Sequence, residues 1–187
     1  MANVDRPNGL RPVKHLTGAP YNGQANKYYI PSTDGTAVFV GDAVKSAGSA
    51  DADGIPTVAQ AAAGDAIRGV VVGVIPVTSS STIYREASTS RYVLVADSPD
   101  ILFEIQEDSG GGALAATDVG NNADIVVGSG STTTGTSGME LDSSTKNTTS
   151  AQLRIVELIQ TADNAIGTNA KWLVKINEHE LTSTTGE

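Results

Sequence analysis

Residues 91–107 read RYVLVADSPDILFEIQE, and this stretch decides the fold class of the chain. Its first part, 91–96, is an apolar, β-branched run that predicts a strand, and 97–100 has turn chemistry at every position. The second part, 101–107, alternates with a period of two, which is the pattern of a half-buried strand. The two faces of that strand are Ile101, Phe103 and Ile105 on one side and Leu102, Glu104 and Gln106 on the other. The two runs around the short link could form a hairpin.

Short apolar runs separated by Gly, Asp, Pro and Ser continue on both sides of this stretch, as in an all-β fold. Further strands are predicted over residues 37–40, 43–44, 55–58, 67–77, 125–127, 152–159 and 171–177, with a weak one at Met139 and Leu141. The 67–77 run is nearly all apolar, which indicates a strand buried on both faces, and Gly69 and Gly73 within it suggest a bulge or a close backbone approach. Helix is nearly absent, so the chain is predicted to be an all-β, jelly-roll-like sandwich or barrel.

Two polar segments are predicted to be loops. Residues 46–54 read SAGSADADG, and Asp51 and Asp53 in it satisfy only two ligand positions of a calcium loop, so we interpret the segment as a turn. In residues 128–150, thirteen of twenty-three residues are Ser or Thr, which predicts an exposed Ser/Thr/Gly-rich loop that supplies no core.

The first 31 residues differ from the rest of the chain. They carry four basic residues, Arg6, Arg11, Lys14 and Lys27, against one acid, whereas the remaining eight bases and twenty acids give −12. Four of the seven prolines also lie here, and neither a helical nor a strand period organises the segment. We therefore predict an extended irregular N-terminal arm over residues 1–35 that lies on another surface, a β domain over 36–181 and a tail over 182–187; the alternative for the arm is a disordered terminus.

Composition excludes several classes of protein. The 187 residues contain no cysteine, so neither a disulfide framework nor thiolate zinc ligands are available. The longest apolar run is far short of the roughly 20 residues that a membrane helix needs, and no signal-peptide core is seen. The net charge of −9 argues against nucleic acid as a partner of the body. We expect no membrane and no nucleic-acid partner, and synthesis in the cytoplasm.

Residues suited to catalysis are scarce. The two histidines, His15 and His179, are interpreted as ordinary polar contacts, and no serine has the glycine pattern of a nucleophile elbow. The acid pairs Glu104/Glu107 and Glu178/Glu180 are interpreted as solvated strand faces. We therefore expect no catalytic residues, no metal and no cofactor, and a structural protein rather than an enzyme.

Several motifs resemble the head decoration, or cement, proteins of tailed bacteriophages. They are NGLRPV at 8–13, GAPYNG at 18–23, YIP at 29–31, GDAV at 41–44, GDAIRGVVVG at 64–73 and WLVKINEH at 172–179. The resemblance implies a β-sandwich or barrel on the outer surface of the virion head, where it bridges neighbouring subunits of the major capsid protein and stabilises the head. It also implies a homo-oligomer, with a homotrimer favoured over a homodimer.

Under this hypothesis the arm binds the capsid. We expect salt bridges to shell carboxylates from Arg6, Arg11, Lys14 and Lys27, and apolar anchoring by Leu10, Tyr21, Tyr28 and Tyr29. Tyrosine and arginine are the residue types that dominate interface energy. Removal of residues 1–31 is expected to abolish shell binding and to leave the β body folded. The alternatives are a carbohydrate-binding or adhesion module on a virion surface, and an enzyme with an unfamiliar Ser/Asp site.

Overall fold

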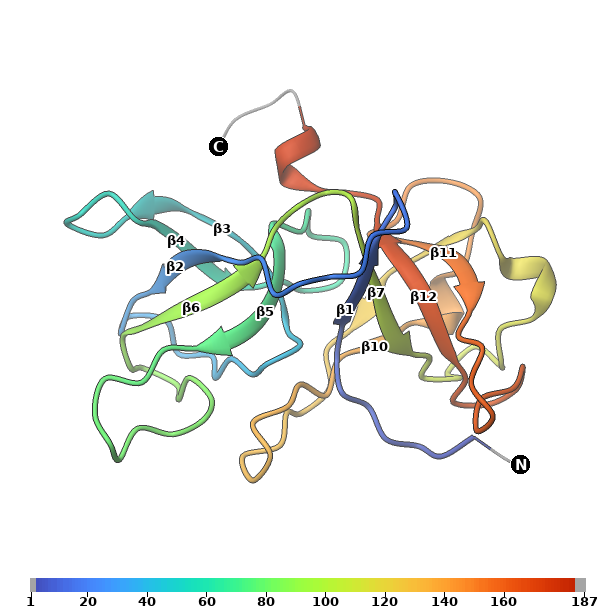
Figure 1. Ribbon diagram of the computed structural model, residues 1–187, viewed down its shortest axis with the longest axis horizontal. Helices are drawn as coiled ribbons and strands as arrows, with labels where there is room; N and C mark the ends of the chain where they lie inside the picture. Colours follow the sequence, from blue (N-terminus) through green and yellow to red (C-terminus); the bar gives the residue numbers. More distant parts are fainter. Residues whose placement is uncertain (1–2, 184–187) are drawn as a thin grey trace.

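Two β lobes lie side by side in the computed structural model, which describes residues 3–183 (Figure 1). The strands are β1 Arg11–His15, β2 Asn26–Ile30, β3 Ala43–Ala50, β4 Pro56–Gln60, β5 Gly69–Val74, β6 Arg91–Ala96, β7 Ile101–Gln106, β8 Asn122–Ala123, β9 Ile125–Val126, β10 Glu140–Leu141, β11 Leu153–Leu158 and β12 Lys171–Ile176. Within the described residues the helical elements are three single 3-10 turns, η1 Ala116–Asp118, η2 Ser143–Thr145 and η3 Glu180–Thr182. The predicted all-β fold is confirmed. None of these helical elements is long and apolar enough to cross a membrane.

The first lobe is a closed five-stranded barrel with the strand order β2-β4-β3-β5-β6. Aliphatic side chains fill its interior because successive residues of a strand point to opposite faces. The buried interior consists of Tyr28, Ile30, Val38, Val44, Val58, Val71, Val93 and Val95.

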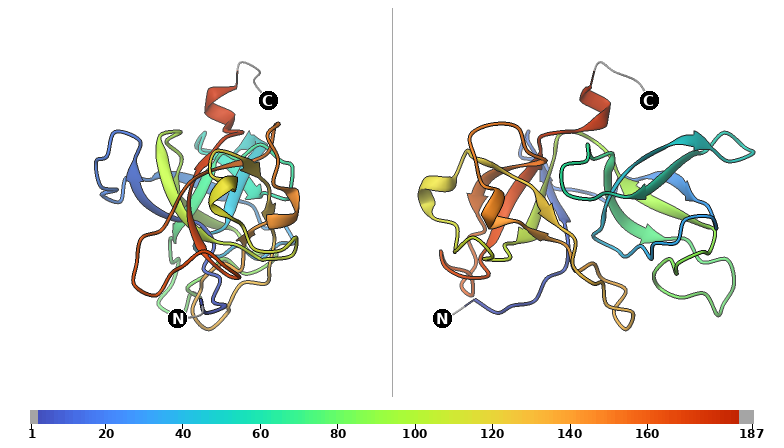
Figure 2. Two further views of the ribbon diagram at one scale, coloured as in Figure 1. Left: turned by 90° about the vertical axis from the view of Figure 1, so that its right-hand side faces the viewer. Right: turned by 180° about the vertical axis from the view of Figure 1, so that it is seen from behind.

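The second lobe is built on a five-stranded antiparallel sheet with the order β1-β7-β12-β11-β8. The two-stranded β9–β10 ribbon lies beside this sheet, because Leu141 of β10 forms a β-bridge with Glu107, the residue that follows β7. Figure 2 shows the two lobes from behind and from the side, with the chain crossing between them more than once.

One hydrophobic core joins the lobes. On β3, β5 and β6 the residues next to the barrel interior point outward instead, and Ala43, Val70 and Ala96 pack with Phe103 and Trp172 of the second lobe. Polar contacts reinforce this junction. The buried Gln152 side chain donates from Nε2 to the carbonyl oxygens of Ala62 (2.8 Å) and Asp65 (2.7 Å) and accepts the Ile125 N–H through Oε1 (3.0 Å). Residues 36–181, predicted as one β domain, thus form two lobes that share a core, and Leu10 from the segment before residue 36 also packs in that core.

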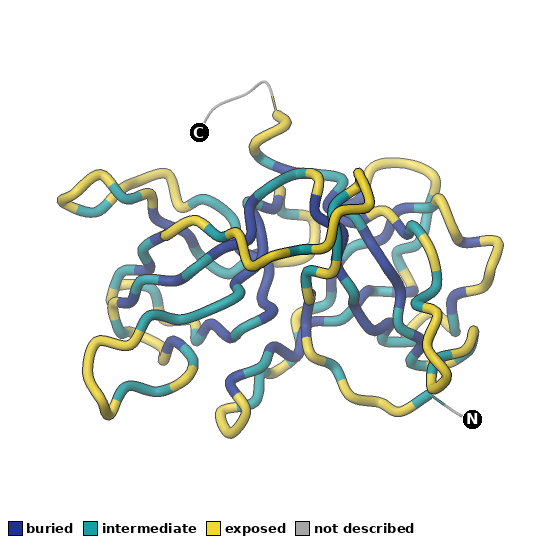
Figure 3. Tube along the Cα trace, in the orientation of Figure 1, coloured by how far each residue is buried: buried dark blue, intermediate teal, exposed yellow. Residues whose placement is uncertain are grey.

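The expectation of an irregular arm over residues 1–35 is wrong for most of the segment. Residues 3–15, which we call the N-terminal strap, run along the second lobe and end in β1, at the edge of its sheet. Residues 16–25 then cross to the barrel as a largely exposed connection (Figure 3). Residues 26–30 form the barrel strand β2, paired with β6. The proline-rich segment thus belongs to the chain's own fold, and residues 1–2 lie outside the described part.

Three further expectations are corrected. The stretches 91–96 and 101–107 do not form a hairpin, because β6 lies in the barrel and β7 in the second lobe. Strand β7 is buried on both faces rather than half-buried. Residues 46–50 continue β3, so only 51–54 form the turn. In that turn the Asp51 carboxylate accepts the N–H groups of Asp53 (2.9 Å) and Ile55 (2.8 Å), as predicted for a turn.

The Ser/Thr-rich segment 128–150 is only partly an exposed loop. Met139 and Leu141 are fully buried, and the predicted short strand at this point is β10. Ser137 and Ser143 are also buried, so the segment does supply core.

The two glycines of β5 have the predicted roles. A Cβ on Gly69 would lie 2.5 Å from the Ala96 carbonyl oxygen, which is a close backbone approach. The β5–β6 register shifts between Val71 and Gly73, which is the predicted bulge.

Candidate functional site: a cationic pocket under the N-terminal strap

Strand register gathers charged side chains on one face of β7. Glu104 lies directly opposite Arg11 of β1 and opposite Leu173 of β12, and Gln106 lies opposite Lys171 of β12. Residues two apart on a strand share a face, so the side chains of Arg11, Glu104, Gln106 and Lys171 point the same way. Three strands that are distant in sequence therefore build one polar surface.

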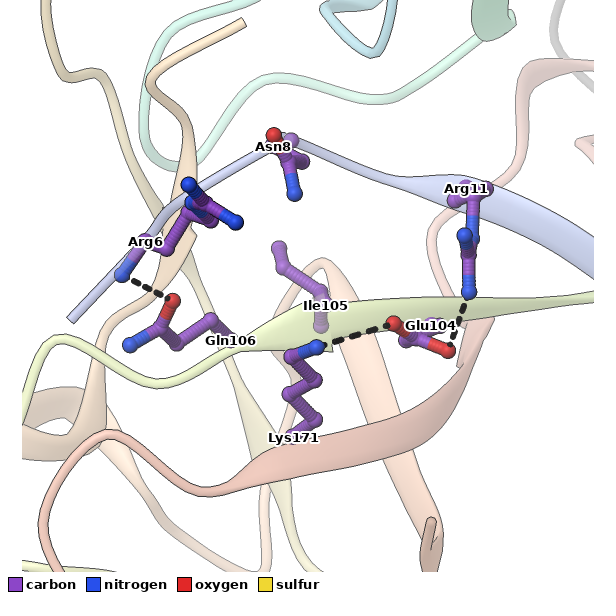
Figure 4. A pocket seen from close by; sticks show the side chains of 8 residues that line it. Arg6, Asn8, Arg11, Glu104, Ile105, Gln106 and Lys171 are labelled. Atoms are coloured by element: carbon purple, nitrogen blue, oxygen red, sulfur yellow. Dashed lines mark hydrogen bonds and ion pairs between the residues drawn. The ribbon is translucent and has the colours of Figure 1, made fainter. Parts of the chain in front are cut away.

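Glu104 is shared by two cations on this surface (Figure 4). The Arg11 Nη2 atom lies 2.9 Å from Glu104 Oε2, and the Lys171 Nζ atom lies 3.8 Å from Glu104 Oε1. The Glu104 side chain is 16% exposed, whereas that of Arg11 is 68% exposed. The carboxylate therefore lies at the base of the site and the guanidinium at its rim.

The strap is fastened to β7 by a side-chain amide. Gln106 Oε1 accepts the Arg6 N–H (2.9 Å), and Gln106 Nε2 donates to the Val4 carbonyl oxygen (3.2 Å). These bonds hold the backbone of Arg6 beside the site, and Arg6 is one of the residues that line it. The exposed Arg6 guanidinium has no hydrogen-bond or ion-pair partner among residues 3–183.

These residues enclose a small hollow, which we call the strap pocket. It has a volume of about 20 Å³ and is lined by Arg6, Asn8, Gly9, Arg11, Glu104, Ile105, Gln106 and Lys171. Its lining carries three cations and one carboxylate. A larger hollow of about 220 Å³ adjoins it, shares Arg6 and Lys171, and adds one acid, Asp163. On a chain with a net charge of −9, the strap pocket is a local positive site.

The structure separates the residues that were expected to bind a capsid. Leu10 (1% exposed) and Tyr28 (3% exposed) are core residues, so their predicted role as apolar anchors is wrong. Tyr21 is half-buried against the shared core. Arg6 and Arg11 meet in the strap pocket, while Lys14 lies farther along β1 and pairs with Glu157 (2.9 Å).

Lys27 and Tyr29 belong to a different surface, on the outside of the barrel. The ring of Tyr29 lies 5.2 Å from that of Tyr92, and Lys27 Nζ lies 4.6 Å from the centre of the Tyr92 ring. The Tyr92 hydroxyl donates to Asp51 Oδ2 (2.6 Å), and this bond raises the pKa of Tyr92 to about 12. We call these four residues the tyrosine patch.

Most of the buried acids and bases serve the fold. Glu107 is fully buried, so its interpretation as a solvated residue is wrong; burial raises the pKa of its carboxyl, and the Leu114 N–H (2.8 Å) and the Ser109 hydroxyl (3.2 Å) stabilise its charge. The buried Arg85 guanidinium donates to the carbonyl oxygens of Pro31 (2.7 Å) and Asp34 (2.8 Å) and so holds that loop.

The histidines are both at structural positions. His179 is buried at the lobe junction, where its Nδ1 accepts the Leu181 N–H (3.1 Å), and burial lowers its pKa. His15 ends β1 beside Tyr21. The interpretation of His179 as an ordinary polar contact agrees with this hydrogen bond. Residues 3–183 contain no cluster of three or more His, Asp or Glu side chains suited to a metal.

Sequence reasoning missed Lys171, Gln106 and Asn8 as members of the site. The alternation of residues 101–107 and of 171–177 did predict that Glu104 and Gln106 share one strand face, and that Lys171 and Lys175 share another. It carried no information on which strands pair. In comparisons with known proteins, no family model, curated protein or solved structure matches the chain.

Proposed function

We propose that this chain is a structural virion protein that binds the outer surface of a phage head and bridges neighbouring capsid subunits. The observation that carries the proposal is a basic strap held on the face of an otherwise acidic β protein, in which the Arg6 guanidinium has no partner among residues 3–183. The sequence resemblance to head decoration proteins supports the same role.

The proposed role is mechanical. A protein that binds only the assembled shell stabilises that shell by mass-action linkage, because disassembly must first release it. Two lobes with a shared core give the bridge one packed body. Oligomerisation, with a homotrimer favoured over a homodimer, would multiply the contacts with the shell and raise avidity.

The structure changes the experiment that tests this proposal. Deletion of residues 1–31 would remove β2 and the core residues Leu10 and Tyr28, so loss of binding would follow from unfolding. The full chain should instead be co-sedimented with expanded, undecorated heads, alongside its mass in free solution. Saturable binding at a fixed ratio to the capsid protein is expected; no binding at micromolar protein would overturn the proposal.

The second candidate function is carbohydrate binding, and the tyrosine patch favours it. Tyr29 and Tyr92 are only half-buried, and a sugar ring that stacks on Tyr92 would take the place of Lys27 over its face. Asp51 adds a hydrogen-bond acceptor beside them. A glycan-binding screen of the full chain and of Tyr92→Ala tests this function: binding that the variant loses would support it.

A further inference from the structure

We propose that the strap pocket binds a carboxylate presented by an acidic side chain of the partner protein. This inference rests on the proposed function, since it names the chemistry of the contact with the shell. Compared with the contacts predicted from the sequence, the proposed site includes Lys171 and Asn8 beside the arginines of the strap, with Glu104 at the bottom of the pocket.

Charge is the first reason. Arg6, Arg11 and Lys171 line the pocket with Glu104 as the one acid in its lining. The adjoining hollow adds Asp163, so the two hollows together keep one positive charge, which one further carboxylate would balance. Arginine presents a planar fork of N–H donors that matches a carboxylate, and such charge-assisted bonds are about twice as strong as neutral ones.

Preorganisation is the second reason. The Arg6 backbone is fixed by Gln106, and Glu104 holds Arg11 and Lys171 from the opposite side (Figure 4). A ligand group would therefore meet cations whose backbone or head groups are already placed, which reduces the entropy lost on binding.

Size and charge together point to a small, singly charged anion. A hollow of about 20 Å³ has space for one water-sized group. A flat carboxylate can insert one oxygen and leave the other at the rim beside Arg11. Its single negative charge matches the one positive charge left by the lining of the two hollows, whereas a phosphate group carries about −1.5 to −2.

The direct test uses the full chain and a small probe. N-acetyl-glutamate N-methylamide is titrated while the side-chain Nε–H signals of Arg6 and Arg11 are followed by NMR, with the corresponding glutamine compound and inorganic phosphate as comparisons. Saturable shifts with the acid alone are expected. Equal shifts with the glutamine compound or with phosphate, or no shift with the acid, would overturn the carboxylate assignment.

The variant test uses heads. In Arg6→Gln/Lys171→Gln the affinity for undecorated heads is expected to fall about tenfold or more, because charge pairs at an interface are lost. Lys175→Gln is the matched control: the same substitution on the same strand, outside the pocket, is expected to change affinity less than about twofold. Wild-type affinity in the double variant would overturn the inference and leave the proposed function intact. Failure of the wild type to bind heads would reject the proposed function, while the titration still decides the pocket.

Discussion

Gly9 and Gly41 touch where the strap meets the segment that leads into the barrel strand β3, and each belongs to a motif on which the sequence resemblance rests. A Cβ on Gly9 would lie 2.4 Å from the Gly41 carbonyl oxygen, and both residues have positive φ angles, +66° and +99°. The Leu10 N–H donates to the same carbonyl oxygen (2.9 Å). Only glycine permits this approach. These motif residues therefore specify how the strap joins the body, and the partner contacts have to be sought in other side chains.

Glu140 gives a prediction at the scale of one residue. Burial, with Asp5 and Asp108 nearby, raises its pKa to about 7 from 4.5. Between about pH 4.5 and 7 the folded state binds more protons than the unfolded state, so stability falls as pH rises through this range. Glu140→Gln removes this penalty. After discounting for partial solvent screening, we expect a gain of about 1–2 kcal/mol in unfolding free energy at pH 8 and little gain at pH 4.

Urea unfolding at the two pH values measures this effect. Glu86→Gln makes the same chemical change at an exposed position and is expected to be neutral at both. A gain for Glu140→Gln that is equal at pH 4 and pH 8 would show that its charge is not the cause.

At the scale of elements, Leu10 is the buried apolar side chain of the strap, and we expect it to be the main anchor. This side chain is 1% exposed and packs in the core shared by the lobes, whereas Val13 of β1 is 37% exposed. Leu10→Ala is expected to cost about 2–4 kcal/mol of unfolding free energy, from lost burial and the cavity left behind. Val13→Ala should cost less than about 0.5 kcal/mol.

Denaturant unfolding and hydrogen exchange of the β1 amides together test the anchor. Faster exchange across Arg11–His15 in Leu10→Ala, and not in Val13→Ala, is the expected result. Equal costs for the two variants would mean that backbone pairing with β7, and not Leu10, holds the strap.

The elements that sequence could predict are those with a local pattern. Residues 91–96, 101–106, 153–158 and 171–176 are apolar or alternating, and each is a strand. The strands β1 and β2 were missed because their prolines and charged residues interrupt any alternation of polar and apolar residues. Their pairing with β7 and β6 joins residues far apart in the sequence, which a local pattern does not predict. For the same reason the candidate site was only half predicted: Arg6 and Arg11 stood out by charge, whereas Lys171 joins them through strand order.

At the scale of the whole molecule, the shared core predicts that the two lobes unfold together. Ala43, Val70 and Ala96 of the barrel pack against the second lobe, so separating the lobes would expose apolar surface on both. Trp172 is the single tryptophan, is fully buried and lies in the second lobe. Its fluorescence reports on that lobe, while circular dichroism reports on both.

A substitution confined to the barrel interior tests this coupling. Val58 is fully buried in the barrel core alone, and Val58→Ala is expected to cost about 1–3 kcal/mol. If the lobes form one cooperative unit, the urea midpoint of Trp172 fluorescence falls by the same amount as that of circular dichroism.

Val77→Ala, at a position 72% exposed, is the control and should move neither midpoint. A Trp172 midpoint that stays at the wild-type value in Val58→Ala would show that the lobes unfold independently; a rigid bridge between capsid subunits would then have to rest on contacts with the shell.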